Sequence, residues 1–251
     1  MYTALLIMLL MFMCVMTIMS SIRKKQSKDD VRTEKKQVKR YYRTIAWMWG
    51  PAIGVIAISL ASGISLSDLG IRAINFNYNI WFNVIILVSS GLILTFSLRT
   101  FIFSLASKTF REEISLEIAG DEVASSILPR TKKEKHLYLF LSFSSGICEE
   151  LIYRGFMAFL LQAIFPEIPV PLLVLIPSVL FGIGHLYQGW RGIIQTGLVG
   201  AIFMCLFLVT NSLLPVMFMH FIINASDTFF LSEENTSEKN DIPEVMPSIH
   251  N

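Results

Sequence analysis

Residues 137–164 read LYLFLSFSSGICEELIYRGFMAFLLQAI, an apolar run whose only charged residues are Glu149, Glu150 and Arg154. A bilayer core of about 30 Å needs about 20 apolar residues in a helix, so this run is long enough to span a membrane. Of the 251 residues in the chain, 53% are hydrophobic and 16% are charged. Soluble domains carry about 25% charged residues. The composition therefore excludes a disordered, collagen-like or nucleic-acid-coating chain and predicts an all-α, polytopic membrane protein.

Further apolar segments on both sides of this run predict about seven transmembrane helices in total, with a range of six to eight. The first segment, residues 3–22, contains no charge and has no basic leader before it. We therefore expect an uncleaved anchor there rather than a signal peptide. The other predicted segments are 44–66, 80–98, 172–187, 192–210 and 213–230.

Positive charge is concentrated in two of the connecting loops. Residues 23–43 are rich in Lys and Arg, and residues 108–135 end in a basic cluster before the fourth segment. The positive-inside rule predicts that both loops are cytoplasmic, with the N-terminus outside and the C-terminus inside. Because the basic block lies between two apolar segments, we read it as such a loop and expect the lipid bilayer, not nucleic acid, as its partner. The predicted location is the cell membrane, as a multi-pass integral protein.

The three charges in the fourth segment are costly at membrane depth. Insertion scales put one charge at the bilayer centre at roughly 2.5–3.5 kcal/mol, so such residues pair, face a wet cavity or lose their charge. Glu150 and Arg154 are four residues apart and share one helix face, whereas Glu149 points about 100° away from Glu150. We therefore expect arginine to hold one carboxylate while the other faces a cavity.

Later segments supply further polar side chains, namely His185 in one and His220 with Asn224, four residues apart, in another. Each alone is typical of helix packing, but together with the carboxylates they form a set suited to hydrolysis. A glutamate and a histidine can activate water, while an amide and a second histidine can donate to an oxyanion. Zinc held by Glu149, His185 and His220 is the alternative, because two histidines and a glutamate bind catalytic zinc elsewhere. The HExxH signature is absent, and we favour metal-free catalysis without a cofactor.

Three motifs in this region resemble those of the CPBP family of intramembrane proteases, relatives of the type II CAAX prenyl endopeptidases that are also called the Abi family. Residues 149–154 (EELIYR) are similar to its EExxxR motif, residues 181–185 (FGIGH) to FxxxH, and residues 220–224 (HFIIN) to HxxxN. The order of the motifs and their place on apolar segments make the resemblance specific. It covers about residues 129–230.

The resemblance implies an intramembrane endopeptidase that acts on peptides or protein tails at the membrane. By motif position, Glu149 and His185 would activate the water molecule, and His220 and Asn224 would form the oxyanion hole. The same positions give Glu150 and Arg154, at the end of the EExxxR motif, supporting roles.

These predictions divide the chain into five parts. We expect a transmembrane anchor at 1–22, a basic cytoplasmic loop at 23–43, transmembrane helices with a second cytoplasmic loop at 44–128, a catalytic membrane core at 129–230 and an acidic, disordered tail at 231–251.

Two other classes of function fit intramembrane Glu, His and Arg residues. A proton-coupled transporter uses such sets along an ion path, but transporters are commonly built from two related halves. Here the polar groups follow residue 145, and the first half of the chain has no counterpart. A non-catalytic membrane immunity or scaffold protein is the other alternative, against which the complete motif set argues.

Overall fold

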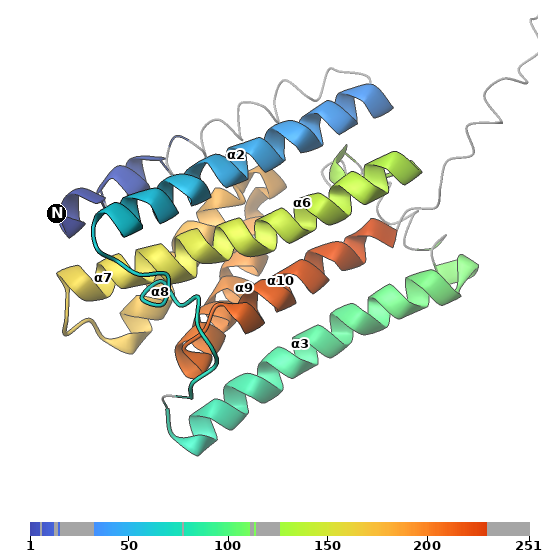
Figure 1. Ribbon diagram of the computed structural model, residues 1–251. Coiled ribbons are helices and arrows are strands. Elements are labelled where there is room, and N and C mark those ends of the chain that lie inside the picture. Colours follow the sequence, from blue (N-terminus) through green and yellow to red (C-terminus); the bar gives the residue numbers. More distant parts are fainter. Residues whose placement is uncertain are drawn as a thin grey trace, which may run out of the picture.

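The computed structural model describes residues 1–5, 7–12, 15, 33–76, 78–110, 113 and 126–229. Its regular elements over these ranges are all helical, and no strand occurs among them (Figure 1). The predicted all-α fold is therefore confirmed. Most of the predicted first segment and the acidic tail at 231–251 lie outside the described residues.

Helix α2 (Glu34–Ala61) begins ten residues before the predicted boundary at residue 44. Thr33 caps it, since its hydroxyl accepts a hydrogen bond from the backbone N–H of Lys36 at 3.4 Å, and Glu34 in the first turn complements the helix dipole. The second half of the basic segment 23–43 is therefore helical rather than a loop.

Helix α3 (Ile80–Ala106) begins where predicted and continues eight residues past the predicted end at residue 98. Asn79 caps it by accepting from the N–H of Phe82 at 2.9 Å. The side chains of Trp81, Leu92 and Phe96 are 76%, 67% and 69% exposed, as expected for a face in contact with lipid.

The stretch with the carboxylate pair forms one long helical rod of three parts. Helix α6 (Lys132–Glu150) passes into a π-helical turn, η1 (Leu151–Met157), and then into α7 (Ala158–Ile164). Thr131 caps α6 by accepting from the N–H of Glu134 at 3.2 Å. The predicted segment 137–164 is thus a single helical unit that starts five residues earlier.

The remaining helices pair closely in space. Helix α8 (Val170–Gly184) leads through a 3-10 turn, η2 (Leu186–Gln188), into α9 (Gly189–Thr210), and α10 (Leu214–Ser226) ends in a second 3-10 turn, η3 (Asp227–Phe229). The α8–α9 crossing depends on Gly182, where a Cβ would lie 2.6 Å from the carbonyl oxygen of Ile193. Only glycine permits this approach.

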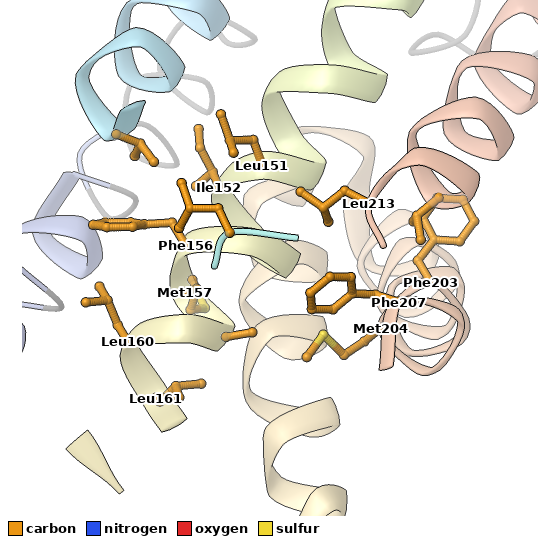
Figure 2. Close-up of a cluster of buried hydrophobic side chains, with 14 of the residues drawn as sticks. Leu151, Ile152, Phe156, Met157, Leu160, Leu161, Phe203, Met204, Phe207 and Leu213 are labelled. Atoms are coloured by element: carbon orange, nitrogen blue, oxygen red, sulfur yellow. The ribbon is translucent and has the colours of Figure 1, made fainter. Parts of the chain in front are cut away.

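A buried apolar cluster joins the rod to α9 (Figure 2). Leu151, Met157 and Leu160 from the rod are almost completely buried, as are Phe203 and Met204 from α9. The cluster surrounds the π-helical turn and so fixes the direction of the side chains on either side of it.

Three helical stretches are long and apolar enough to cross a membrane: Glu34–Ala61, Ile80–Arg99 and Leu186–Thr210. Shorter apolar helices occupy Tyr2–Phe12, Val170–Gly184 and Leu214–Ser226. This arrangement is that of a polytopic membrane protein, and the count of seven spans stays a prediction.

At one end of the bundle, the loop after α2 is fastened to the turn between α9 and α10. Arg72 donates from Nε to the carbonyl oxygen of Asn211 at 2.7 Å and from Nη2 to its Oδ1. Leu213 N–H donates to the carbonyl oxygen of Gly70 at 2.8 Å. Asn211 has a φ of 50°, a left-handed conformation that Asn tolerates.

At the opposite end, the start of α2 contacts the residues that precede α6. The Tyr41 hydroxyl donates to the carbonyl oxygen of Ile127 at 2.6 Å, and Gln37 Nε2 donates to the same oxygen at 3.1 Å. Both segments were predicted to be cytoplasmic, and the structure places them together.

Candidate active site

The two adjacent glutamates at the end of α6 differ in their surroundings. The Glu150 side chain is completely buried, while 19% of the Glu149 side chain is exposed. The 100° between neighbouring helix residues accounts for this difference. The structure thus separates one carboxylate enclosed by protein from one that is accessible, as predicted from the spacing.

Glu150 and Arg154 form a fully buried ion pair, with Arg154 Nη1 at 2.8 Å from Glu150 Oε1. Arg154 Nη2 also donates to the carbonyl oxygen of Gly200 on α9 at 3.3 Å. Its guanidinium carbon lies 4.3 Å from the centre of the Phe181 ring on α8, in cation–π geometry. A Cβ on Gly200 would lie 3.1 Å from Nη2, so the glycine leaves room for the guanidinium.

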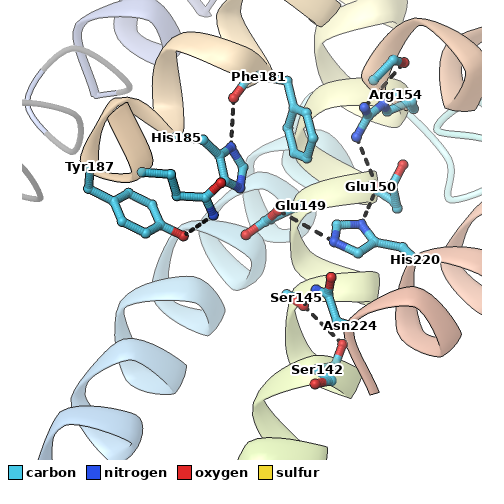
Figure 3. Close-up of polar contacts among 12 residues, drawn as sticks. Ser142, Ser145, Glu149, Glu150, Arg154, Phe181, His185, Tyr187, His220 and Asn224 are labelled. Carbon is cyan, nitrogen blue, oxygen red and sulfur yellow. Dashed lines mark hydrogen bonds and ion pairs between the residues drawn. The ribbon is translucent and has the colours of Figure 1, made fainter. Parts of the chain in front are cut away.

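His220 on α10 lies between the two carboxylates. Its Nδ1 is 2.6 Å from Glu150 Oε1, and its Nε2 is 3.8 Å from Glu149 Oε2 (Figure 3). Because the Glu150 carboxylate is paired with Arg154, it is ionised and can only accept, so the proton of the short bond belongs to Nδ1. Glu150 therefore determines which ring nitrogen of His220 faces Glu149.

His185, which follows the last residue of α8, is oriented by its own helix. Its Nδ1 is 2.8 Å from the carbonyl oxygen of Phe181, an acceptor, so Nδ1 carries the proton here as well. The imidazole and the Glu149 carboxylate point toward one another in Figure 3, and no hydrogen bond or ion pair joins these two described residues. The Nε2 lone pair of a neutral His185 is thus free.

The Phe181 ring separates the two histidines. Its centre lies 4.7 Å from the ring of His185 and 6.1 Å from that of His220. Phe203 on α9 covers another side of His220, with a ring separation of 5.6 Å. These aromatic side chains confine the polar groups to one small region and hold both rings in place.

Asn224 lies one helical turn after His220 and has a partner on α6. Its Nδ2 donates to the hydroxyl oxygen of Ser145 at 2.9 Å, and that hydroxyl donates to the carbonyl oxygen of Ser142 at 2.9 Å (Figure 3). Ser145 was missed by motif reasoning, although it precedes Glu149 by four residues and therefore shares its helix face.

The structure brings all six predicted residues into one region, although the contacts within it differ in strength. Direct contacts join Glu150, Arg154, His220 and Glu149, whereas His185 approaches without a bond. Among the described residues, no group of three or more His, Cys, Asp or Glu side chains is arranged to hold a metal ion. The zinc alternative stays a prediction.

Comparison with known proteins gives one match, over the part of the chain that contains these residues. Residues 133–226 match the model of the family described as type II CAAX prenyl endopeptidase Rce1-like. The curated proteins and the solved structures that were searched contain no match to the chain. The matched range begins in α6 and ends with α10, so it contains the carboxylate pair, both histidines and Asn224. Residues 133–226 are thus similar to that family, and the match confirms the resemblance seen in the three motifs.

Proposed function

We propose that the protein is an intramembrane endopeptidase that hydrolyses a peptide bond in membrane-associated peptides or protein tails, with Glu149 as the general base. The observation that carries this proposal is the contrast within the glutamate pair. Glu150 is bound by Arg154 and His220, which leaves Glu149 as the accessible carboxylate of the pair. A base must reach the proton that it removes, and the partial exposure of Glu149 supports this role over the enclosed Glu150.

In the proposed reaction, a water molecule between Glu149 and His185 attacks the carbonyl carbon of the scissile peptide bond. Its proton passes to the Glu149 carboxylate, while His185 Nε2 accepts its second hydrogen bond and orients it. The tetrahedral oxyanion accepts a hydrogen bond from Asn224 Nδ2. Collapse breaks the C–N bond, and Glu149 returns the proton to the leaving nitrogen, so that a carboxylic acid and an amine are released.

His220 can serve the oxyanion only in its protonated form. Its Nδ1 proton is bound by Glu150, so Nε2 becomes a donor only when the ring carries two protons.

Zinc catalysis has one observation in its favour. Both His185 and His220 bind an oxygen through Nδ1, which is how metal-ligating histidines are commonly oriented. Asn224, however, would have little to do beside a metal that stabilised the oxyanion itself. The metal-free reaction is therefore the proposal.

The test uses purified protein in liposomes with a peptide that ends in a prenylated CAAX sequence, together with a mass-spectrometric comparison of new protein termini in membranes with and without the active protein. Glu149→Gln preserves the shape of the side chain and removes the base, so cleavage should fall by about 10²–10⁴-fold. Glu167→Gln, a change at an exposed carboxylate after α7, is the matched control and should cleave normally.

Metal dependence is measured on the same preparations. Activity should survive exhaustive treatment with a strong chelator, and elemental analysis should find well below one zinc per chain. Loss of cleavage on chelation, with recovery when zinc is added, would replace the glutamate mechanism with the zinc alternative. If the wild type generates no new termini, the endopeptidase proposal fails. That result would favour the two alternative functions, a membrane scaffold or a transporter.

A further inference from the structure

We infer that Ser145 is a positioning residue that fixes the Asn224 carboxamide with its N–H group, rather than its oxygen, directed at the reacting carbonyl. The role of Asn224 as a donor to the oxyanion rests on the proposed function. The orientation of its carboxamide rests on hydrogen bonds within α6 and between α6 and α10. Ser145 belongs to none of the three motifs, and its side chain is buried.

The direction of the hydrogen bonds is decided by the hydroxyl group. A serine hydroxyl has one proton, and that of Ser145 is donated to the carbonyl oxygen of Ser142 at 2.9 Å. Toward Asn224, 2.9 Å away, the Ser145 oxygen can therefore only accept. The carboxamide must present its NH2 group to Ser145, because its oxygen would meet an oxygen without a proton.

This arrangement leaves one donor for the substrate. The Asn224 nitrogen carries two hydrogens, of which Ser145 accepts one, and the second stays available to an oxyanion. An unrestrained carboxamide could rotate by 180° and turn its oxygen to the same point, where it would repel the developing negative charge. Ser145 thus excludes the inhibitory orientation and does not itself contact the substrate.

Close packing of the two helices makes the bond attainable. A Cβ on Gly146 would lie 2.9 Å from the carbonyl oxygen of Met217 and 3.1 Å from the N–H nitrogen of Phe221. Glycine at this position permits α6 and α10 to approach closely enough for the short Ser145 side chain to reach Asn224.

The neighbouring serine is a matched control. The Ser144 hydroxyl donates to the carbonyl oxygen of Phe140 at 2.8 Å and accepts from Trp49 Nε1 on α2 at 3.0 Å. Ser144 and Ser145 therefore have the same hydrogen-bonding pattern on the same helix, one toward a structural tryptophan and the other toward Asn224. Loss of either hydroxyl removes one interhelical hydrogen bond. Only the bond of Ser145 involves a residue of the candidate active site, Asn224.

The first measurement is steady-state kinetics with the prenylated CAAX peptide. Ser145→Ala should lower kcat about 10- to 100-fold with little change in KM, the range typical of partners that orient a functional group. Ser144→Ala should keep the wild-type kcat. In an Asn224→Ala background, Ser145→Ala should have no further effect on kcat. An equal loss in that background, or an equal loss from Ser144→Ala, would overturn the inference.

The second measurement does not depend on activity. The Tm of each variant in detergent should show that Ser145→Ala and Asn224→Ala are coupled, with the double variant losing no more than the larger single loss, whereas Ser144→Ala and Asn224→Ala should be additive. Additive losses for the first pair would overturn the inference. Coupled losses without hydrolysis by the wild type would overturn the proposed function and keep the pairing.

Discussion

At the scale of single residues, Arg154 is the largest of the completely buried side chains in the described part of the chain. It is completely buried, and the partners that offset its charge are Glu150, the Gly200 carbonyl oxygen and the Phe181 ring. A buried ion pair adds little net stability, but removal of one partner leaves the other charge buried and unpaired. The pair therefore matters chiefly because neither member can be lost alone.

We predict that Arg154→Met lowers the free energy of unfolding by about 3–5 kcal/mol, since Glu150 is then ionised without its cation. Thermal unfolding in detergent measures the change. Arg191→Met, at an exposed position of α9, is the control and should cost less than about 0.5 kcal/mol. If Arg154→Met lowers the free energy of unfolding as little as the control does, then another group must compensate the buried Glu150 carboxylate.

Spacing in the sequence predicted the contacts within one helix and none of those between helices. Residues four apart on a helix must lie on one face, which is why the Glu150–Arg154 pair was predictable. The bonds from His220 to Glu150 and from Asn224 to Ser145 depend on how α10 packs against α6. No local pattern encodes that packing.

At the scale of helices, the crossing of α8 and α9 determines where His185 lies. His185 follows the last residue of α8, and the crossing is tight at Gly182, three residues before it. Any change that separates these two helices moves the histidine relative to Glu149. The packing of α8 against α9 therefore affects both the position of His185 and the stability of the protein.

We predict that Gly182→Ala destabilises the protein by about 1–3 kcal/mol, because the new methyl group meets the Ile193 carbonyl oxygen at 2.6 Å. Cleavage should fall as well, through displacement of His185. Gly91→Ala on α3 is the control: nothing lies within 4 Å of its Cβ position, and alanine favours helix by about 1 kcal/mol. Tm and peptide cleavage are measured for both, and equal Tm values would contradict the tight crossing.

Helix boundaries were predicted less well than helix positions. Hydropathy detects the part of a helix that lies in hydrocarbon, whereas α2 and α6 continue through polar turns to the threonine caps at Thr33 and Thr131. The π-helical turn at Leu151–Met157 was not predicted either, because its sequence is as apolar as an ordinary helix.

At the scale of the whole molecule, segments predicted to lie on one side of the membrane meet at one end of the bundle. The start of α2 contacts residues 126–127, and the loop after α2 contacts the turn between α9 and α10. Charge in the sequence predicted, through the positive-inside rule, that the first two segments share one side of the membrane. The hydrogen bonds at the second end join Arg72 to Asn211 and backbone groups to one another, and a lone arginine in a short loop could not have predicted them in that way.

We predict that a cysteine at Lys133 is cytoplasmic and one at Ser67 is outside, in a background where the native cysteines do not react. Both positions are exposed. An impermeant thiol reagent added to intact cells should label the Ser67→Cys protein at once and the Lys133→Cys protein only after lysis. The reverse pattern would invert the topology, and labelling of both before lysis would place the two ends on one side.

The π-helical turn determines what a deletion of one codon in the gene would do to the protein. A single π turn is equivalent to one residue inserted into an α-helix, so the loss of one codon would allow the rod to become regular. Loss of the codon for Phe156 would leave every letter of the three motifs in place and yet remove a buried side chain from the apolar cluster. A gene with that deletion would still contain the three motifs while encoding a protein with a defect in its core, because the motifs do not include the residues that pack around the π-helical turn.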